Sequence, residues 1–252
     1  MSQPALQGAA ALAVWGSVSS NEVDEAALND WWTNEHLPER MSIPGFLRAR
    51  RYMARDEAAS ASGTTITRYL TLYETEDVHT LTSREYMAAV SNPTPGTRLY
   101  LPRLPSMDRA ACRVAYSERR AEFAHAAWKT TGALMGMMEF IVPESNTVAD
   151  AVEAIKPAFT QWAQNERSLM SCSLLVEDAE ASAPGNGSQA HLNGNLGSAA
   201  QREGGSRCML LLEFAKTLQP LVQDMGVFLD QSPFFDGPKV MRFYQFVAGI
   251  GA

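Results

Sequence analysis

The stretch Arg68-Tyr-Leu-Thr-Leu-Tyr-Glu74 has a counterpart in Arg207-Cys-Met-Leu-Leu-Leu-Glu213. Each is a mostly apolar run of strand length that begins with arginine and ends with glutamate. Upstream of the two runs, Trp32 and Trp162 occupy matching places near the ends of two expected helices. The chain therefore predicts two passes through one series of elements, which is the sign of an internal repeat.

Each pass is expected to read strand, helix, strand, strand, helix, strand. The first pass places strands near 9–18, 46–54, 66–74 and 109–117 and helices near 22–37 and 78–91. The second places strands near 133–142, 168–177, 206–214 and 239–248 and helices near 147–165 and 217–231. This order predicts the α+β class, with two ferredoxin-like βαββαβ repeats whose open sheet faces pack together as an intramolecular, pseudo-dimeric α+β barrel.

Two prolines affect the expected helices. Pro38 is expected to end the first helix at about His36, because the residue before a proline is biased away from helical geometry. Pro157 is expected to kink the second-pass helix or to delay its start.

The predicted domains follow the two passes. Residues 1–120 form the first repeat with the functional pocket, 121–131 form a linker, and 132–252 form a second, mainly structural repeat. A loop at 179–205, rich in Gly, Ser, Ala and Asn, is expected to be flexible.

Composition narrows the class of partner. A formal net charge of −7, without a run of Lys or Arg, argues against nucleic acid or an anionic membrane as the main partner. The first basic residue is Arg40, so a signal peptide's positive start is missing. The odd, widely separated Cys112, Cys172 and Cys208 are expected to be buried free thiols of a cytoplasmic protein.

Candidate chemistry is concentrated between Trp31 and Tyr52. A histidine at an expected helix end, His36, is followed by a Pro-Gly turn and a basic, aromatic strand. Imidazole transfers protons near neutral pH, and guanidinium groups bind carboxylates through two hydrogen bonds. The strand supplies Arg48, Arg50, Arg51 and Tyr52.

This part of the chain resembles the EthD-like members of the dimeric α+β barrel superfamily. The resemblance covers about a third of the chain, all in the first pass, and rests on Trp32, Asn34-Glu35-His36-Leu37-Pro38, Pro44-Gly45-Phe46, Ala49-Arg50-Arg51-Tyr52 and Ser91-Asn-Pro-Thr-Pro-Gly-Thr-Arg98. That superfamily includes muconolactone isomerases, small monooxygenases of aromatic polyketides, decarboxylating or cyclising enzymes and haem-binding relatives of chlorite dismutase. The resemblance implies the fold more firmly than the chemistry. Relatives associate further, so homo-oligomerisation stays open.

Alternation along each strand predicts which side chains line the barrel. In the third strand, Leu70 and Leu72 are expected under the helices, and the other face lines the barrel. The face of Arg51 stays open, because a bulge after the Pro-Gly turn would swap the pattern. The second half offers few polar candidates, namely Glu139, Arg242 and Tyr244. The predicted lining consists of Phe46, Arg48, Arg50, Tyr52, Tyr69, Thr71, Tyr73 and Arg113.

These residues receive the following roles. His36 is the proposed proton shuttle, with Tyr73 or Tyr69 as a second donor or acid. The substrate-binding set is Arg50, Arg51, Arg48, Tyr52, Trp32 and Arg113. Structural alternatives also exist. His36 could cap its helix, Trp32 could pack on His36 as core, and the arginines could pair with Glu35, Glu39 or Glu74, of which Glu35 and Glu39 are expected in solvent.

The functional expectation is a cofactor-free enzyme without a metal that acts on a small unsaturated or aromatic carboxylate. The expected chemistry is proton transfer, as in isomerisation, decarboxylation or hydrolysis of an activated ester or lactone. One alternative is cofactor-independent oxygenation of a phenolic aromatic. Another is a small-molecule binding protein without turnover, so whether the protein is an enzyme stays open. No nucleophile elbow, phosphate-binding loop, dinucleotide fingerprint or His-Glu-x-x-His motif occurs in the sequence.

Overall fold

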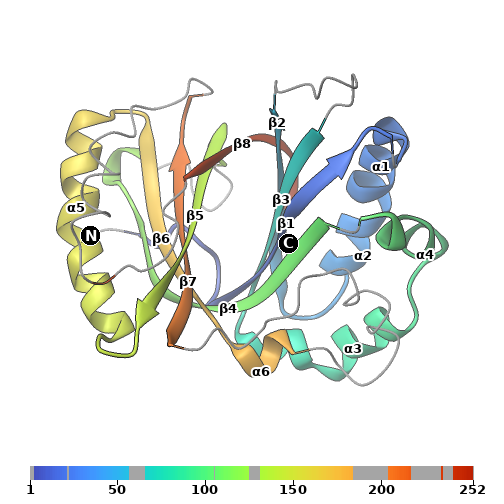
Figure 1. The fold of residues 1–252 in the computed structure, drawn as a ribbon, viewed down its shortest axis with the longest axis horizontal. Helices are drawn as coiled ribbons and strands as arrows, with labels where there is room; N and C mark the ends of the chain where they lie inside the picture. The colour runs from blue at the N-terminus through green and yellow to red at the C-terminus, as the bar shows by residue number, and fades with distance from the viewer. Residues whose placement is uncertain are drawn as a thin grey trace. The chain divides into compact units, whose positions relative to one another are not determined.

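The computed structural model describes residues 3–21, 23–56, 66–104, 106–124, 131–183, 204–216, 234 and 241–251 of the 252-residue chain. Its elements, in chain order (Figure 1), are β1 (Ala10–Ser19), α1 (Glu25–Trp31), the π-helical turn η1 (Trp32–His36), α2 (Leu37–Met41), β2 (Phe46–Asp56), β3 (Ile66–Thr75), the short helix η2 (Val78–Thr82), α3 (Arg84–Ser91), α4 (Pro95–Tyr100), η3 (Leu101–Arg103), β4 (Ser106–Arg119), β5 (Leu134–Pro143), α5 (Val148–Asn165), β6 (Leu169–Glu177), α6 (Ala179–Ser182), β7 (Gly205–Phe214) and β8 (Arg242–Gly251).

These elements form two compact units. The N-terminal unit is built from Gly8–Cys112, α6 and the end of β8 from Val247 onward. The C-terminal unit is built from Arg113–Glu177, β7, the start of β8 and the residues up to Gln7. Both β4 and β8 are divided between the units, so the division after Cys112 lies before the domain end predicted at residue 120.

The strands follow the same order in both passes of the chain. The order is β4-β1-β3-β2 in the first pass and β8-β5-β7-β6 in the second. Strand β3 pairs antiparallel with β1 and β2, and β7 pairs antiparallel with β5 and β6. The α+β class predicted from the sequence is confirmed. No described helix combines the length and the apolar character needed to cross a bilayer.

Each unit has its own hydrophobic core. In the N-terminal unit, the helices pack on one face of β1, β3 and β2 (Figure 1), where Leu28 and Leu37 join a cluster with Tyr73. In the C-terminal unit, α5 contributes Ile155 and Phe159 to a second cluster. The three cysteines are buried free thiols, as predicted.

The first helical segment is longer than predicted. Instead of ending near His36, it continues through η1 and α2 to Met41. In the π-helical turn, the N–H of Leu37 bonds to the carbonyl of Trp32, five residues back. Pro38 then lies in the first turn of α2, where a missing N–H costs little. This continuation places the residues after His36 on the same helical rod.

The second pass differs from its prediction in two places. Helix α5 begins at Val148 behind a capping box of Thr147 and Asp150 and runs through Pro157, so a late start is excluded. The loop expected at 179–205 begins with the short helix α6. The rest of that loop and the helix expected near 217–231 lie outside the described residues, apart from Gly204 and Gly205 at the start of β7.

The predicted facing of β3 is wrong. Tyr69 and Tyr73 face the helices and join their cluster, whereas Leu70 and Leu72 lie on the opposite face. All four side chains are at most 2% exposed, so the strand is buried on both faces. The alternation of polar and apolar residues therefore does not show which side chains face the helices. In β2, a bulge between Phe46 and Arg48 turns Phe46 to the helix side, against the prediction.

Candidate functional site

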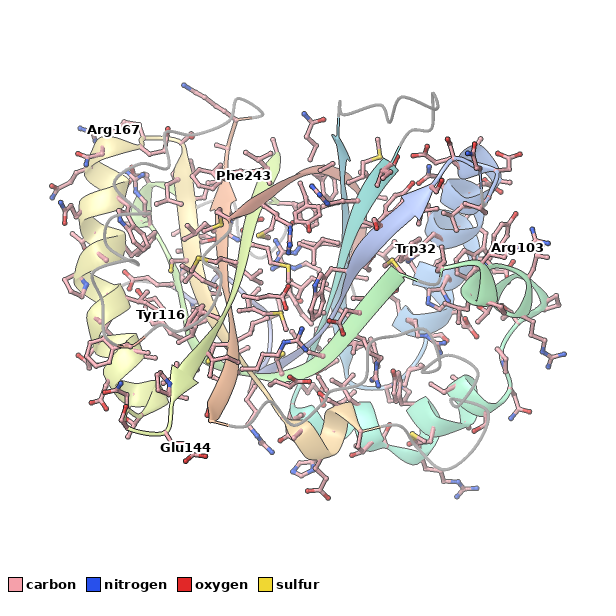
Figure 2. The ribbon with its side chains drawn as sticks, viewed as in Figure 1. Trp32, Arg103, Tyr116, Glu144, Arg167 and Phe243 are labelled. Atoms are coloured by element: carbon pink, nitrogen blue, oxygen red, sulfur yellow. The ribbon has the colours of Figure 1, made fainter. Side chains whose placement is uncertain are left out.

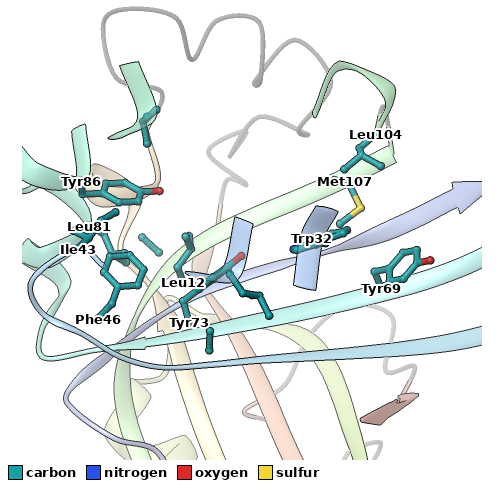
Figure 3. Close-up of a cluster of buried hydrophobic side chains, with 14 of the residues drawn as sticks. Leu12, Trp32, Ile43, Phe46, Tyr69, Tyr73, Leu81, Tyr86, Leu104 and Met107 are labelled. Atoms are coloured by element: carbon teal, nitrogen blue, oxygen red, sulfur yellow. The ribbon is translucent and has the colours of Figure 1, made fainter. Parts of the chain in front are cut away.

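A cavity of about 80 Å³ lies in the N-terminal unit between the helices and the sheet. Figure 3 shows Trp32, Tyr73, Tyr86 and Met107 within the buried cluster around it. Most of its walls are apolar or aromatic, with three basic side chains among them. The lining residues are Leu12, Val14, Trp31, Trp32, His36, Arg40, Tyr73, Tyr86, Val90, Leu101, Leu104, Met107 and Arg109.

One helical rod supplies much of the polar chemistry. Trp32, His36 and Arg40 are spaced four residues apart, so they lie on one face of the segment α1–η1–α2. All three line the cavity, and Figure 2 shows Trp32 between the helices and the strands. The sequence predicted Trp32 and His36 here but missed Arg40. The four-residue spacing continued past Pro38 would have found it.

His36 is buried and held on one ring nitrogen. Its Nδ1 lies 3.3 Å from Thr97 Oγ1 and 3.3 Å from Glu39 Oε2. Trp31, not Trp32 as the sequence suggested, packs on the imidazole, with ring centres 4.9 Å apart. Burial lowers the pKa of His36 below its ordinary value, although the hydrogen bond with Glu39 acts in the opposite direction. The imidazole is therefore mainly neutral at pH 7.

Arg40 is a buried guanidinium without a hydrogen-bond partner on Nη1 among the described residues. The residue is 6% exposed, and its guanidinium carbon lies 5.9 Å from the centre of the Tyr86 ring. The indole N–H of Trp31, which also lines the cavity, is likewise buried and has no hydrogen-bond partner among the described residues. The cavity therefore contains hydrogen-bond donors that the described protein does not satisfy.

Tyrosine and a second arginine complete the polar lining. Burial raises the pKa of Tyr73 to about 12, so its hydroxyl stays protonated at neutral pH. Arg109, from β4, lines the cavity and its Nη1 donates to the carbonyl of Ser182 at 3.4 Å. Neither Tyr86 nor Arg109 was predicted as a site residue. Tyr73 was predicted, although on the wrong face of its strand.

Arg48 and Arg50, predicted to hold a substrate carboxylate, have the predicted facing but a partner within the protein. Both guanidinium groups bind the buried carboxylate of Glu74, at 2.8 Å and 2.7 Å. They project on the sheet face opposite the helices, as does the buried Tyr52, and none of the three lines the cavity. The predicted structural alternative, pairing with Glu74, is the one observed.

Arg51 and Tyr69 form a separate cluster beside the cavity. The guanidinium of Arg51 lies between the rings of Trp32 and Tyr69, 4.7 Å and 4.8 Å from their centres. It also bonds to Asn29 and Thr33. The Tyr69 hydroxyl donates to Glu25 Oε1 at 2.9 Å, and burial raises its pKa to about 12. Neither residue lines the cavity, so their predicted direct roles are not supported.

Two other expectations change with the structure. Arg113 is exposed and belongs to the C-terminal unit, so it does not join the lining. Glu39, expected in solvent, has a side chain that is only 15% exposed, and its carboxylate contacts His36. Within the described ranges, no three His, Cys, Asp or Glu side chains gather as a metal site would require.

Comparison with known proteins identifies the fold. No model of a protein family and no curated protein matches the chain. Among solved structures, the chain is similar to an anthrone oxidase-like protein, with a TM-score of 0.52 and 10% identity over 100% of this chain and 96% of that chain. It is also similar to a "putative monooxygenase" of Fusobacterium nucleatum subsp. nucleatum (TM-score 0.45, 10% identity, 98% of this chain and 96% of that chain). The third, a "putative monooxygenase" of Lactobacillus acidophilus, has a TM-score of 0.43 and 8% identity over 95% of this chain and 93% of that chain. At 10% identity, the likeness to the first of these shows the fold alone.

Proposed function

We propose that the protein is an enzyme that transfers a proton on a small aromatic or unsaturated acid bound in this cavity. The observation that carries the proposal is the buried Arg40, which has an unsatisfied N–H group in the cavity lining. A buried N–H group without a hydrogen-bond partner is costly, and a ligand anion supplies the missing partner. Arg40 thus takes the anion-binding role that was predicted for Arg50.

His36 is the proposed base. Its neutral ring can accept a proton from a C–H or O–H group of the substrate, giving an imidazolium beside Glu39. The substrate then carries the negative charge, and Arg40 stabilises it as an enolate or a carboxylate. Return of the proton to another atom gives isomerisation, and departure of a leaving group with its electron pair gives elimination. In decarboxylation, His36 would take the acid proton, CO₂ would leave its bonding electrons on the substrate, and the same proton would return to that carbon.

A second candidate is oxygenation of an electron-rich phenol by molecular oxygen. The aromatic lining formed by Trp31, Trp32, Tyr73 and Tyr86 favours it, because such walls suit a flat ring. His36 would take the phenol proton and Arg40 would hold the phenolate. The phenol itself would supply the electrons: one atom of O₂ would enter the ring, which becomes a quinone, and the other would leave as water with two hydrogens from the substrate. Oxygen uptake distinguishes this reaction from proton transfer alone.

The first test is calorimetric binding of small aromatic carboxylates, dienoic carboxylates and phenols to the protein and to Arg40→Leu. Loss of a charged hydrogen bond costs about 1.5–3 kcal/mol, so affinity should fall by roughly 10- to 150-fold. Arg98→Leu, which removes an exposed arginine from α4, is the matched control and should bind as the native protein does. Equal binding by Arg40→Leu would contradict the anion site.

Ligands that bind are then assayed for turnover with the native protein and His36→Gln. The proposal expects the variant to retain the ligand and to lose the reaction. A ligand that binds tightly to both proteins and is never converted would identify a binding protein without turnover, the remaining alternative.

The assignments of an internal repeat, a cellular compartment and an oligomeric state are also proposals. The same 4-1-3-2 strand order in both passes supports a tandem repeat. Three buried free thiols support a cytoplasmic protein. Homo-oligomerisation is testable by light scattering of the purified chain.

A further inference from the structure

The Nδ1 atom of His36 has two oxygen neighbours that come from different elements. Glu39 Oε2, one helical turn along the same rod, lies 3.3 Å away. Thr97 Oγ1, from α4, lies at the same distance of 3.3 Å. Thr97 is 1% exposed, so water does not compete strongly for these contacts.

The protons available around Thr97 set the direction of its hydrogen bonds. The Thr94 hydroxyl donates to Thr97 Oγ1 at 2.9 Å, and the Thr97 hydroxyl donates its single proton to Glu39 Oε2 at 3.4 Å. An ionised carboxylate accepts hydrogen bonds only. Both oxygens therefore face Nδ1 as acceptors, and Nδ1 must carry the proton.

We propose that Glu39 and Thr97 are positioning residues that hold neutral His36 as its Nδ1–H tautomer, which leaves Nε2 as the ring nitrogen that accepts a substrate proton. The inference rests on the proposed function, in which His36 is the base, and it names the reacting atom and the residues that select it. Glu39 and Thr97 act through His36 and are not placed in the cavity lining.

Three charged side chains influence the pKa of the imidazole. Arg40 lowers the pKa of His36, whereas Glu39 and Glu35 raise it, and burial is the largest influence. From α4, Thr97 is uncharged and the Gly96 N–H donates to Glu35 at 3.2 Å. Burial acts to raise the pKa of Glu39, but its hydrogen bond with His36 and the charge of Arg40 outweigh this, so its pKa is lowered and it is ionised at pH 7.

The test is nitrogen-15 NMR of the imidazole ring in the intact protein without ligand, since the two neutral tautomers have distinct nitrogen shifts. Signals of His36 are assigned by their loss in His36→Gln. The native protein should show mainly the Nδ1–H form above pH 7. Glu39→Leu and Thr97→Val each remove one acceptor, and both variants should shift His36 toward the Nε2–H form, more strongly together.

Two conservative variants separate positioning from simple damage. Glu39→Gln keeps an acceptor oxygen but loses the charge, so the Nδ1–H form should persist while the pKa of His36 falls further. Thr97→Ser keeps the hydroxyl and should match the native protein in both tautomer and pKa. Circular dichroism checks that each variant is folded.

An Nε2–H form in the native protein would overturn the inference, as would an unchanged tautomer in the folded double variant Glu39→Leu, Thr97→Val. The result is independent of turnover. If ligand binding fails but the tautomer behaves as expected, only the proposed function is lost. If ligands bind through Arg40 but His36 is in the Nε2–H form, only the proposed roles of Glu39 and Thr97 are contradicted.

Discussion

Four arginines close together in the sequence have three different environments. Arg48 and Arg50 share the buried carboxylate of Glu74. Arg51 lies between two aromatic rings, where cation–π attraction contributes about 0.5–2 kcal/mol. Arg40 has an unsatisfied N–H group in the cavity. Only the last lines the cavity, whereas the other three have charged or aromatic partners within the protein.

This difference predicts opposite effects on stability. Glu74→Leu removes the carboxylate that compensates two buried guanidinium groups and should lower the free energy of unfolding by about 3–5 kcal/mol. Arg40→Leu removes a buried charge without such a partner and should leave stability unchanged or raised. Urea unfolding of both variants at pH 7.5 measures the contrast. A loss for Arg40→Leu as large as for Glu74→Leu would show that Arg40 has a structural role.

At the level of elements, α4 is attached to the helical rod at the edge of the cavity. The Gly96 N–H bonds to Glu35, Thr97 contacts His36, and Tyr100 stacks on Trp31 with ring centres 5.0 Å apart. Trp31 is thereby held between α4 and the imidazole. The position of α4 therefore determines how the cavity wall is built.

Gly96 permits this close packing because it has no side chain. A Cβ atom there would lie 2.3 Å from Trp31 Cδ1 and 2.6 Å from Glu35 Oε1. Gly96→Ala should lower the free energy of unfolding by about 1–3 kcal/mol, as overpacking does. It should also weaken ligand binding, because Trp31 must move. Calorimetry and urea unfolding measure both effects, with Arg98→Ala on the same helix as the control. Unchanged binding by Gly96→Ala would show that Trp31 does not shape the site.

For the whole molecule, the continuity of β4 and β8 matters most. Each strand contributes residues to both compact units. Unfolding one unit therefore disrupts two strands that continue into the other. We expect the two units to unfold together.

Leu210→Ala tests this expectation in the core of the C-terminal unit, where Leu210 is fully buried. The truncation should cost about 2–5 kcal/mol. Circular dichroism and tryptophan fluorescence, to which Trp15, Trp31 and Trp32 of the N-terminal unit contribute, should shift to one common, lower midpoint. Leu99→Ala, at a side chain that is 46% exposed, should change stability little. Two separated transitions in Leu210→Ala would mean that the units unfold independently.

The sequence by itself determined the α+β class and the extent of most strands, and it predicted as site residues His36, Trp32 and Tyr73, which line one cavity in the structure. These features depend on local periodicity and on the order of elements, both of which can be read along the chain. The thiols of Cys112, Cys172 and Cys208 were also predicted correctly as buried and free.

Only the tertiary structure decided which arginine faces the cavity. The strands are buried on both faces, so polarity does not show which way a side chain points, and a bulge after Phe46 changes the alternation. Because the helix continues through the π-helical turn and past Pro38, Arg40 lies in the lining of the cavity. Partner choice among Arg40, Arg48 and Arg50 depends on the distant Glu74, because a buried charge is satisfied by whatever the fold brings near it.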